Sequence, residues 1–176
     1  MRVLLDACVL VPALTRGLLL GAAREGWFEP LWSERIFGEW QRAADKHGEP
    51  LAAATRTEQA LLNHAFGKAE VAVPQRDDLW LPDADDVHVL SAAIAGHAKE
   101  LLTANTGDFP TRILAQHGLI RRHPDEFLLE LAENHSGKMQ RVAADVLSAL
   151  PNADHKPRTV YKRSGLNRFG KFLDRL

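Results

Sequence analysis

The chain of 176 residues has the length of one ordinary domain, with room for at most a short appendage. Its 45% hydrophobic and 26% charged residues exclude a disordered chain. No apolar run approaches the roughly 20 residues of a membrane span, and Asp6 interrupts the run that a secretory leader would need. A single cysteine, Cys8, excludes a disulfide framework and a cysteine-based zinc site. We therefore expect a cytoplasmic protein without a membrane anchor.

Charge is distributed unevenly along the chain. Residues 151–176 hold seven Lys or Arg and two Asp and carry +5, so residues 1–150 carry −6 of the net charge of −1. We predict a domain over 1–150 and a basic, loosely packed tail over 151–176, because the apolar pattern thins there. The tail is expected to contact nucleic acid or an acidic partner. The alternative is a helix whose basic residues only face solvent. The candidate contact residues are Lys156, Arg158, Lys162 and Arg163.

The predicted elements of the first half begin with a short apolar run that ends at a carboxylate. This run, 3–5, is typical of a strand buried on both faces. A helix is expected over 10–24, a strand over 28–32, and a helix that Ser33 caps and that ends near 47–50. The Ala-rich stretch 51–66 predicts another helix.

The second half continues this alternation of strands and helices. We expect strands over 71–73, 101–103 and 119–120. A loop over 74–82 precedes a helix that Asp85 or Asp86 caps and that runs to about His97. Pro110 and Pro124 each open a further helix. Strands that alternate with helices predict an α/β fold with a mainly parallel sheet.

Several common kinds of site are absent from the sequence. It contains no Gly-rich phosphate loop and no His-Glu-x-x-His zinc motif. A cysteine phosphatase would need Arg six positions after Cys8, where Leu14 stands, and a phosphoaspartyl enzyme would need an acid at position 8 itself.

Acidic residues at the ends of elements remain as candidates. Asp6 closes the first strand, and sites of open parallel sheets lie beyond the carboxyl ends of the strands; its alternative role is a helix cap. Glu39 borders an apolar helix face and so requires a partner or a metal. The alternative for Glu39 is pairing with Arg35 or Arg42.

A second group of acids surrounds the start of the fourth predicted helix. Asp83, Asp85 and Asp86 are more acids than one cap requires, and close carboxylates repel unless a cation lies among them. Asn105 and Asp108 follow the strand at 101–103, where Asp108 is either a ligand or a cap for the helix at Pro110. Oxygen ligands alone favour a hard cation, Mg²⁺ or Mn²⁺, over zinc.

Four stretches of the sequence resemble the four acidic motifs of PIN-domain ribonucleases, and especially the toxins of VapC-type toxin–antitoxin systems. They occur in order between about residues 2 and 128. These stretches are Asp6-Ala-Cys-Val-Leu, Trp32-Ser-Glu-Arg-Ile-Phe-Gly-Glu39-Trp, Leu81-Pro-Asp-Ala-Asp-Asp86-Val-His-Val-Leu-Ser-Ala-Ala and Leu102-Thr-Ala-Asn105-Thr-Gly-Asp108-Phe-Pro.

The resemblance implies a three-layer fold with about five parallel strands between helices, and cleavage of RNA that depends on Mg²⁺ or Mn²⁺. It also implies a homodimer, a cognate antitoxin, and RNA as substrate, with tRNA as one candidate. Asp6, Glu39, Asp86 and Asp108 match the catalytic acids, and Asp6, Asp86 and Asp108 are the expected metal ligands. Asn105, Asp85 and Ser33 are expected to support them. The alternative function is a PIN-like module with weakened activity that binds RNA or a partner, because Asn105 stands where the family commonly has Asp.

Overall fold

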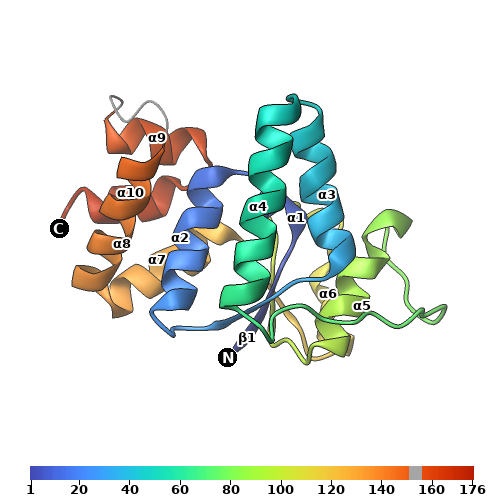
Figure 1. Ribbon diagram of the computed structural model, residues 1–176. Helices are drawn as coiled ribbons and strands as arrows, with labels where there is room; N and C mark the ends of the chain where they lie inside the picture. The colour runs from blue at the N-terminus through green and yellow to red at the C-terminus, as the bar shows by residue number, and fades with distance from the viewer. Residues whose placement is uncertain (151–155) are drawn as a thin grey trace.

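The computed structural model describes residues 1–150 and 156–176 (Figure 1). The predicted boundary between domain and tail, at 150/151, borders residues 151–155, which lie outside the described residues. The elements in chain order are β1 (Arg2–Leu5), α1 (Ala7–Leu10), α2 (Ala13–Arg24), β2 (Glu29–Leu31), α3 (Glu34–Asp45), α4 (Glu49–Ala65), η1 (Ala84–Asp86), α5 (Val87–Ala95), β3 (Glu100–Leu102), α6 (Thr111–Gln116), β4 (Ile120–Arg122), α7 (Pro124–Asn134), α8 (Ser136–Ala149), α9 (Pro157–Arg163) and α10 (Asn167–Leu173).

The strands form one parallel sheet in the order β2-β1-β3-β4. Val3 is the Cα partner of Pro30 on one side and of Glu100 on the other, and Glu100 pairs onward with Ile120. The central strand β1 is apolar throughout its inner part, and Val3, Leu4 and Leu5 have no exposed surface. The α/β fold with a parallel sheet between helices is therefore confirmed, with four strands among the described residues rather than about five.

The strand predicted over 71–73 does not form. Only Glu70 makes a parallel bridge, to Trp32, and the Val71 amide donates to the Trp32 carbonyl at 2.8 Å. Pro74 has no amide to extend this pairing, and its carbonyl accepts a hydrogen bond from the Ser91 hydroxyl at 3.3 Å. The Val-Ala-Val pattern is therefore an extended segment beside the sheet edge, which reduces the predicted strand count.

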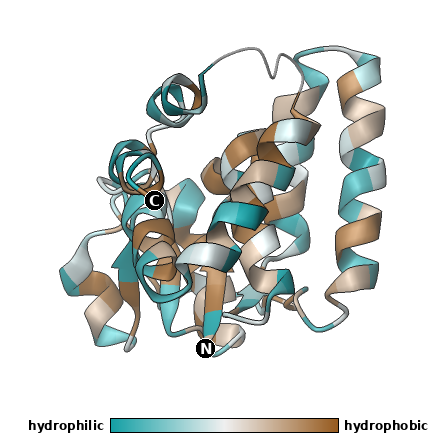
Figure 2. Ribbon diagram, turned by 90° about the vertical axis from the view of Figure 1, so that its left-hand side faces the viewer, coloured by the Kyte–Doolittle hydropathy of each residue, from teal (hydrophilic) through white to brown (hydrophobic). Residues whose placement is uncertain are grey.

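Local sequence signals account for the helix boundaries around the sheet. The helix predicted over 10–24 begins only at Ala13, after Pro12 at its N-cap position, and the short helix α1 before it was not predicted. Ser33 caps α3 as predicted, because its hydroxyl accepts from the Ile36 amide at 3.3 Å. Figure 1 shows α2, α4 and α3 side by side in front of β1, and Arg16 of α2 donates to Glu58 of α4 at 2.8 Å. In Figure 2 hydrophobic and hydrophilic residues alternate along the helices, as expected where one face is buried.

The described part of the tail, residues 156–176, packs against the domain, which corrects the prediction of loose packing there. Tyr161, Leu166 and Phe169 are buried, and α10 packs against α7. The buried carboxylate of Asp125, in the first turn of α7, accepts the amide of Arg168 at 3.0 Å and that of Phe169 at 2.9 Å. The start of α10 is thereby fixed to α7. No helix among residues 1–150 and 156–176 is both long and apolar enough to cross a membrane.

Candidate active site

Asp6 lies directly beyond the carboxyl end of β1 and is 6% exposed. Its Oδ2 accepts hydrogen bonds from the Thr103 hydroxyl at 2.7 Å and from the Cys8 thiol at 2.9 Å. The Ala104 amide donates to Cys8 Sγ at 3.2 Å, which ties this cluster to the end of β3. The hydrogen bonds between described residues leave Oδ1 of Asp6 unused. Asp6 does not cap α1 with its side chain, so its second oxygen remains available to a ligand.

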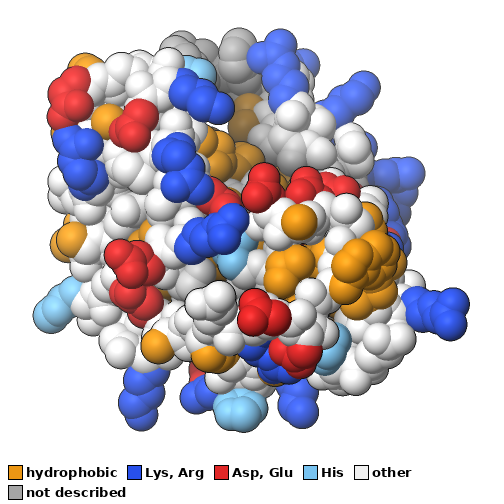
Figure 3. Space-filling model, turned by 90° about the vertical axis from the view of Figure 1, so that its right-hand side faces the viewer, with side chains coloured by type: hydrophobic (Ala, Val, Ile, Leu, Met, Phe, Trp, Pro, Cys, Tyr) orange, Lys and Arg blue, Asp and Glu red, His pale blue; other side chains and the backbone are white. Residues whose placement is uncertain are grey.

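Three carboxylates converge where η1 and the loop after β3 meet. One oxygen each of Asp83, Asp86 and Asp108 lies within 4.8 Å of the other two. Two of the expected metal ligands, Asp86 and Asp108, are thus together, and the third member of the trio is Asp83 rather than Asp6. Figure 3 shows Asp and Glu side chains near the centre of the face that carries α5 and α6, with Lys and Arg side chains around them.

The capping at this helix start differs from the prediction. Asp83, not Asp85 or Asp86, provides the side-chain cap, since its Oδ1 accepts from the Asp85 amide at 2.9 Å. The Asp86 carboxylate makes no cap hydrogen bond. Asp85 is 95% exposed in its side chain and lies 3.9 Å from Nη2 of Arg35. Asp86 is therefore left free of a capping role while Asp85 points to solvent beside Arg35.

Glu39 lies on α3 with three basic side chains nearby. Its Oε1 is 3.9 Å from Nε of Arg35, 3.7 Å from Nη2 of Arg42 and 2.7 Å from Nε2 of His88. The arginine pairing anticipated as the alternative for Glu39 is present, at long distances. The contact with His88 is close but lacks the alignment of a hydrogen bond, so both ring nitrogens are buried without an aligned partner among the described residues.

Electrostatics within this group oppose ionisation of the carboxylates. Burial, and then the charges of Asp6, Asp83, Asp108 and Glu39, raise the pKa of Asp86 to about 6. Burial and the charge of Asp6 also raise the pKa of Glu39, against the opposing effect of Arg35 and Arg42. A bound cation would relieve this repulsion. The donor set therefore fits a hard divalent ion held by oxygen ligands.

Asn105 and Asp108 contact each other in the loop after β3. The Asn105 side-chain amide donates to Oδ2 of Asp108, and the Asn105 backbone amide donates to the Thr103 hydroxyl at 3.0 Å. Helix α6 begins after Pro110, which stands at the cap position rather than inside the helix, and no side chain caps it. Asp108 therefore does not serve as the cap of α6, which was the alternative to a ligand role.

The four basic tail candidates lie apart from the acids. Figure 1 shows α9 and α10 on the left and α5 and α6 on the right. Arg158 is engaged within the tail, at 3.5 Å from Oδ2 of Asp174. Lys156, Lys162 and Arg163 are exposed. The structure thus brings together Asp86 and Asp108, and links Glu39 to Asp85 through Arg35, but it does not join the basic candidates to them.

The sequence placed Asp83 in an acidic group that a cation would relieve, but Asp83 was not among the expected metal ligands, and the contact of His88 with Glu39 was not predicted. The signal for Asp83 was its spacing of three from Asp86, which places both on one turn. The partner of His88 comes from α3, and no local pattern predicts that packing. Ser33 is 2% exposed and its hydroxyl is occupied as the α3 cap, so it supports the site by fixing the start of that helix.

Comparison with known proteins places this arrangement in a family. A family model described as PIN domain matches residues 2–107, more than half of the chain. The match contains Asp6, Glu39 and Asp86 and ends one residue before Asp108. No curated protein and no solved structure matches the chain. The order of the acidic motifs, the parallel sheet and this match together show that the chain belongs to the PIN-domain family.

Proposed function

We propose that the protein is a metal-dependent endoribonuclease that uses Mg²⁺ or Mn²⁺, and that it is the toxin of a type II toxin–antitoxin pair. PIN domains are generally nucleases that act on nucleic acid. The observation that carries the proposal is the convergence of Asp83, Asp86 and Asp108 in a chain of this family. The toxin role, a homodimer and an antitoxin partner rest on the resemblance to VapC-type toxins.

The carboxylates supply the chemistry that hydrolysis of a phosphodiester requires. Asp86 and Asp108, with Asp6 through its unused Oδ1, would hold the cation, and Asp83 is a further oxygen donor at the same place. The bound cation supplies charge stabilisation at the phosphate and a more acidic water. Glu39 or Asp86 would accept the proton of the attacking water as a general base. The expected products carry 5′-phosphate and 3′-hydroxyl ends.

A weakened module that binds RNA or a partner is the second candidate. The contact between the Asn105 amide and Asp108 favours it, because one oxygen of that carboxylate is already engaged. Four acids in the motifs oppose it, since binding alone does not need converging carboxylates.

The test measures RNA cleavage by three samples of purified protein. They are the wild type with Mn²⁺, the wild type with EDTA, and the Asp6→Asn variant with Mn²⁺. We expect cleavage only by the wild type with metal. RNA binding without cleavage by the wild type would establish the second candidate. Cleavage that persists in EDTA or in the variant would reject the metal mechanism.

A further inference from the structure

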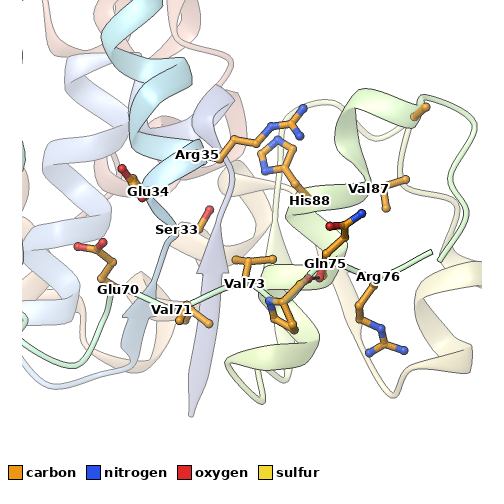
Figure 4. A pocket seen from close by; sticks show the side chains of 14 residues that line it. Ser33, Glu34, Arg35, Glu70, Val71, Val73, Gln75, Arg76, Val87 and His88 are labelled. Atoms are coloured by element: carbon orange, nitrogen blue, oxygen red, sulfur yellow. Dashed lines mark hydrogen bonds between the residues drawn. The ribbon is translucent and has the colours of Figure 1, made fainter. Parts of the chain in front are cut away.

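A pocket of about 750 Å³ lies beside the acidic residues (Figure 4). Three stretches of chain form it: the first turn of α3, the extended segment 70–76 next to the sheet edge, and the start of α5. A cavity of this size accepts a small organic group rather than a single ion.

The pocket shares residues with the candidate active site. Arg35 lines the pocket, lies 3.9 Å from Glu39, and donates to the Asp85 carbonyl at 3.2 Å. His88 also lines it, and its Nε2 is 2.7 Å from Glu39. A group that fills the pocket therefore lies next to the phosphate on which the acids would act.

Polar groups in the pocket lack partners. The His88 side chain is 8% exposed, and neither ring nitrogen has an aligned hydrogen bond among the described residues. The amides of Glu34 and Arg35 belong to the first turn of α3, where no intrahelical acceptor exists. Gln75 adds an amide that both donates and accepts. The pocket thus offers donors and acceptors that a ligand edge would satisfy.

Charge in the pocket is balanced, which disfavours a phosphate as occupant. Glu34 and Glu70 lie at the end away from His88 (Figure 4). Arg76, which also lines the pocket, is engaged by Asp78 at 2.9 Å. The remaining walls are largely apolar and include Val71, Val73, Pro74 and Val87. A lining that is about equally polar and apolar, with its charges balanced, suits a flat, uncharged heteroaromatic ring, which has apolar faces and a polar edge.

We propose that this pocket accepts an unpaired nucleobase of the RNA strand, next to the phosphate at the acidic residues, and that His88 and Gln75 bond to its edge. The inference rests on the proposed nuclease function and adds a source of base selectivity to it. Proteins read single-stranded RNA by bonding to the edges of unstacked bases. The acids themselves contact only phosphate and cannot supply that selectivity.

An uncharged nucleoside tests the pocket separately from cleavage. Each of adenosine, guanosine, cytidine and uridine is titrated to about 10 mM, since one small contact surface gives millimolar affinity. The readout is the ¹⁵N spectrum of the histidine rings, with His88 assigned from its missing signal in His88→Gln. We expect one nucleoside to shift the His88 signal, and the shift to weaken in Gln75→Ala but not in Gln140→Ala, an exposed glutamine on α8.

A cleavage assay on RNA of random sequence tests the same residues in the reaction. We expect the wild type to prefer one base beside the cut by at least about fivefold, the lower end of discrimination by paired hydrogen bonds. Gln75→Ala should lose most of this preference while Gln140→Ala keeps it. If the wild type cleaves but no nucleoside shifts His88 and Gln75→Ala keeps the preference, the pocket assignment is wrong and the nuclease function stands. If His88 shifts but the wild type cleaves no RNA, the pocket assignment stands and the nuclease function is wrong.

Discussion

At the scale of single residues, Asp86 shows most clearly how the surroundings of the site oppose ionisation of its carboxylates. Partial burial and four neighbouring carboxylates raise the pKa of Asp86 to about 6. A group with a pKa raised in the folded state stabilises the protein below its unfolded pKa, near 4, and that contribution is lost as the pH rises through 6. The metal-free protein should therefore lose stability between about pH 4 and pH 6 on account of this group.

Replacing Asp86 with Asn should abolish cleavage and stabilise the metal-free protein at about pH 7. The expected gain is about 1 kcal/mol, because solvent screening reduces what the pKa shift alone would give. Urea unfolding in EDTA at about pH 7 and about pH 4 measures it, and the gain should disappear at the lower pH. Asp145→Asn, an exposed acid on α8, is the control. A loss of stability in Asp86→Asn would instead assign this carboxylate a structural role.

Asp108 and Asn105 divide the role of the fourth acidic motif. Asp108→Asn should weaken Mn²⁺ binding about tenfold and slow cleavage, since an amide oxygen is a poorer ligand for a hard cation. Asn105→Asp should preserve or increase both the Mn²⁺ affinity and the rate of cleavage, because it adds a carboxylate beside Asp108. Titration calorimetry with Mn²⁺ measures the affinities. Unchanged affinity in Asp108→Asn together with lower stability would show that this residue maintains the loop rather than binding the ion.

At the scale of elements, Asp125 fixes α10 through two backbone amides. Asp125→Ala should lower the free energy of unfolding by about 2 kcal/mol, since it removes two bonds to a charged acceptor and leaves buried donors unpaired. Urea unfolding measures this loss. Glu126→Ala is the matched control, because it removes only an exposed contact with Arg168 at 3.3 Å. Equal stability of the two variants would contradict the role given to Asp125.

The elements that the sequence predicts well are those with strong local signals. The strands β1, β2, β3 and β4 all lie within two residues of their predicted positions. In β1 and β3 the signal is an apolar run that is buried in the sheet. Val71–Val73 has the same local pattern but lies at the sheet edge, where a single bridge forms before Pro74. Phe169 lies on α10, which packs against α7, and Tyr161 packs edge-on against Phe169. Because α7 is a separate part of the chain, the sparse apolar pattern of the tail does not predict this packing.

The sequence names candidate residues for the site but not their geometry. The motifs identify the acids Asp6, Glu39, Asp86 and Asp108 from the sequence alone. Which of them approach one another depends on how α3, α5 and the loop after β3 pack. The same packing produces the contact of His88 on α5 with Glu39 on α3. The helical period of 3.6 residues shows which residues share a face of one helix, but not which residues of two helices meet.

At the scale of the whole molecule, the tail helices α9 and α10 lie on the left of Figure 1, and α5 and α6, next to the acidic residues, lie on the right. If RNA contacts both regions, replacing Lys162 and Arg163 with Gln should lower the slope of log affinity against log salt by about 1.4, at about 0.7 per contact to a single strand. The measurement uses an RNA oligonucleotide and the inactive Asp6→Asn background. Neutralising Lys46 and Lys68 in the same way controls for net charge. An unchanged slope would mean that the tail residues only face solvent.

Deleting the tail is a poorer test, because it would expose the surface of α7 that Phe169 covers.

The sheet order also determines when the site can exist during folding. The amide of Asp6 donates to the Leu102 carbonyl at 3.1 Å, and the Asp6 carboxylate meets Thr103, far along the chain. Bringing these ends together requires closure of a loop that holds most of the first hundred residues, and such nonlocal pairing is slow. Asp6 therefore joins the other acids only when β1 and β3 pair, so a partly folded chain in which these strands are separate would lack this carboxylate at the proposed metal site.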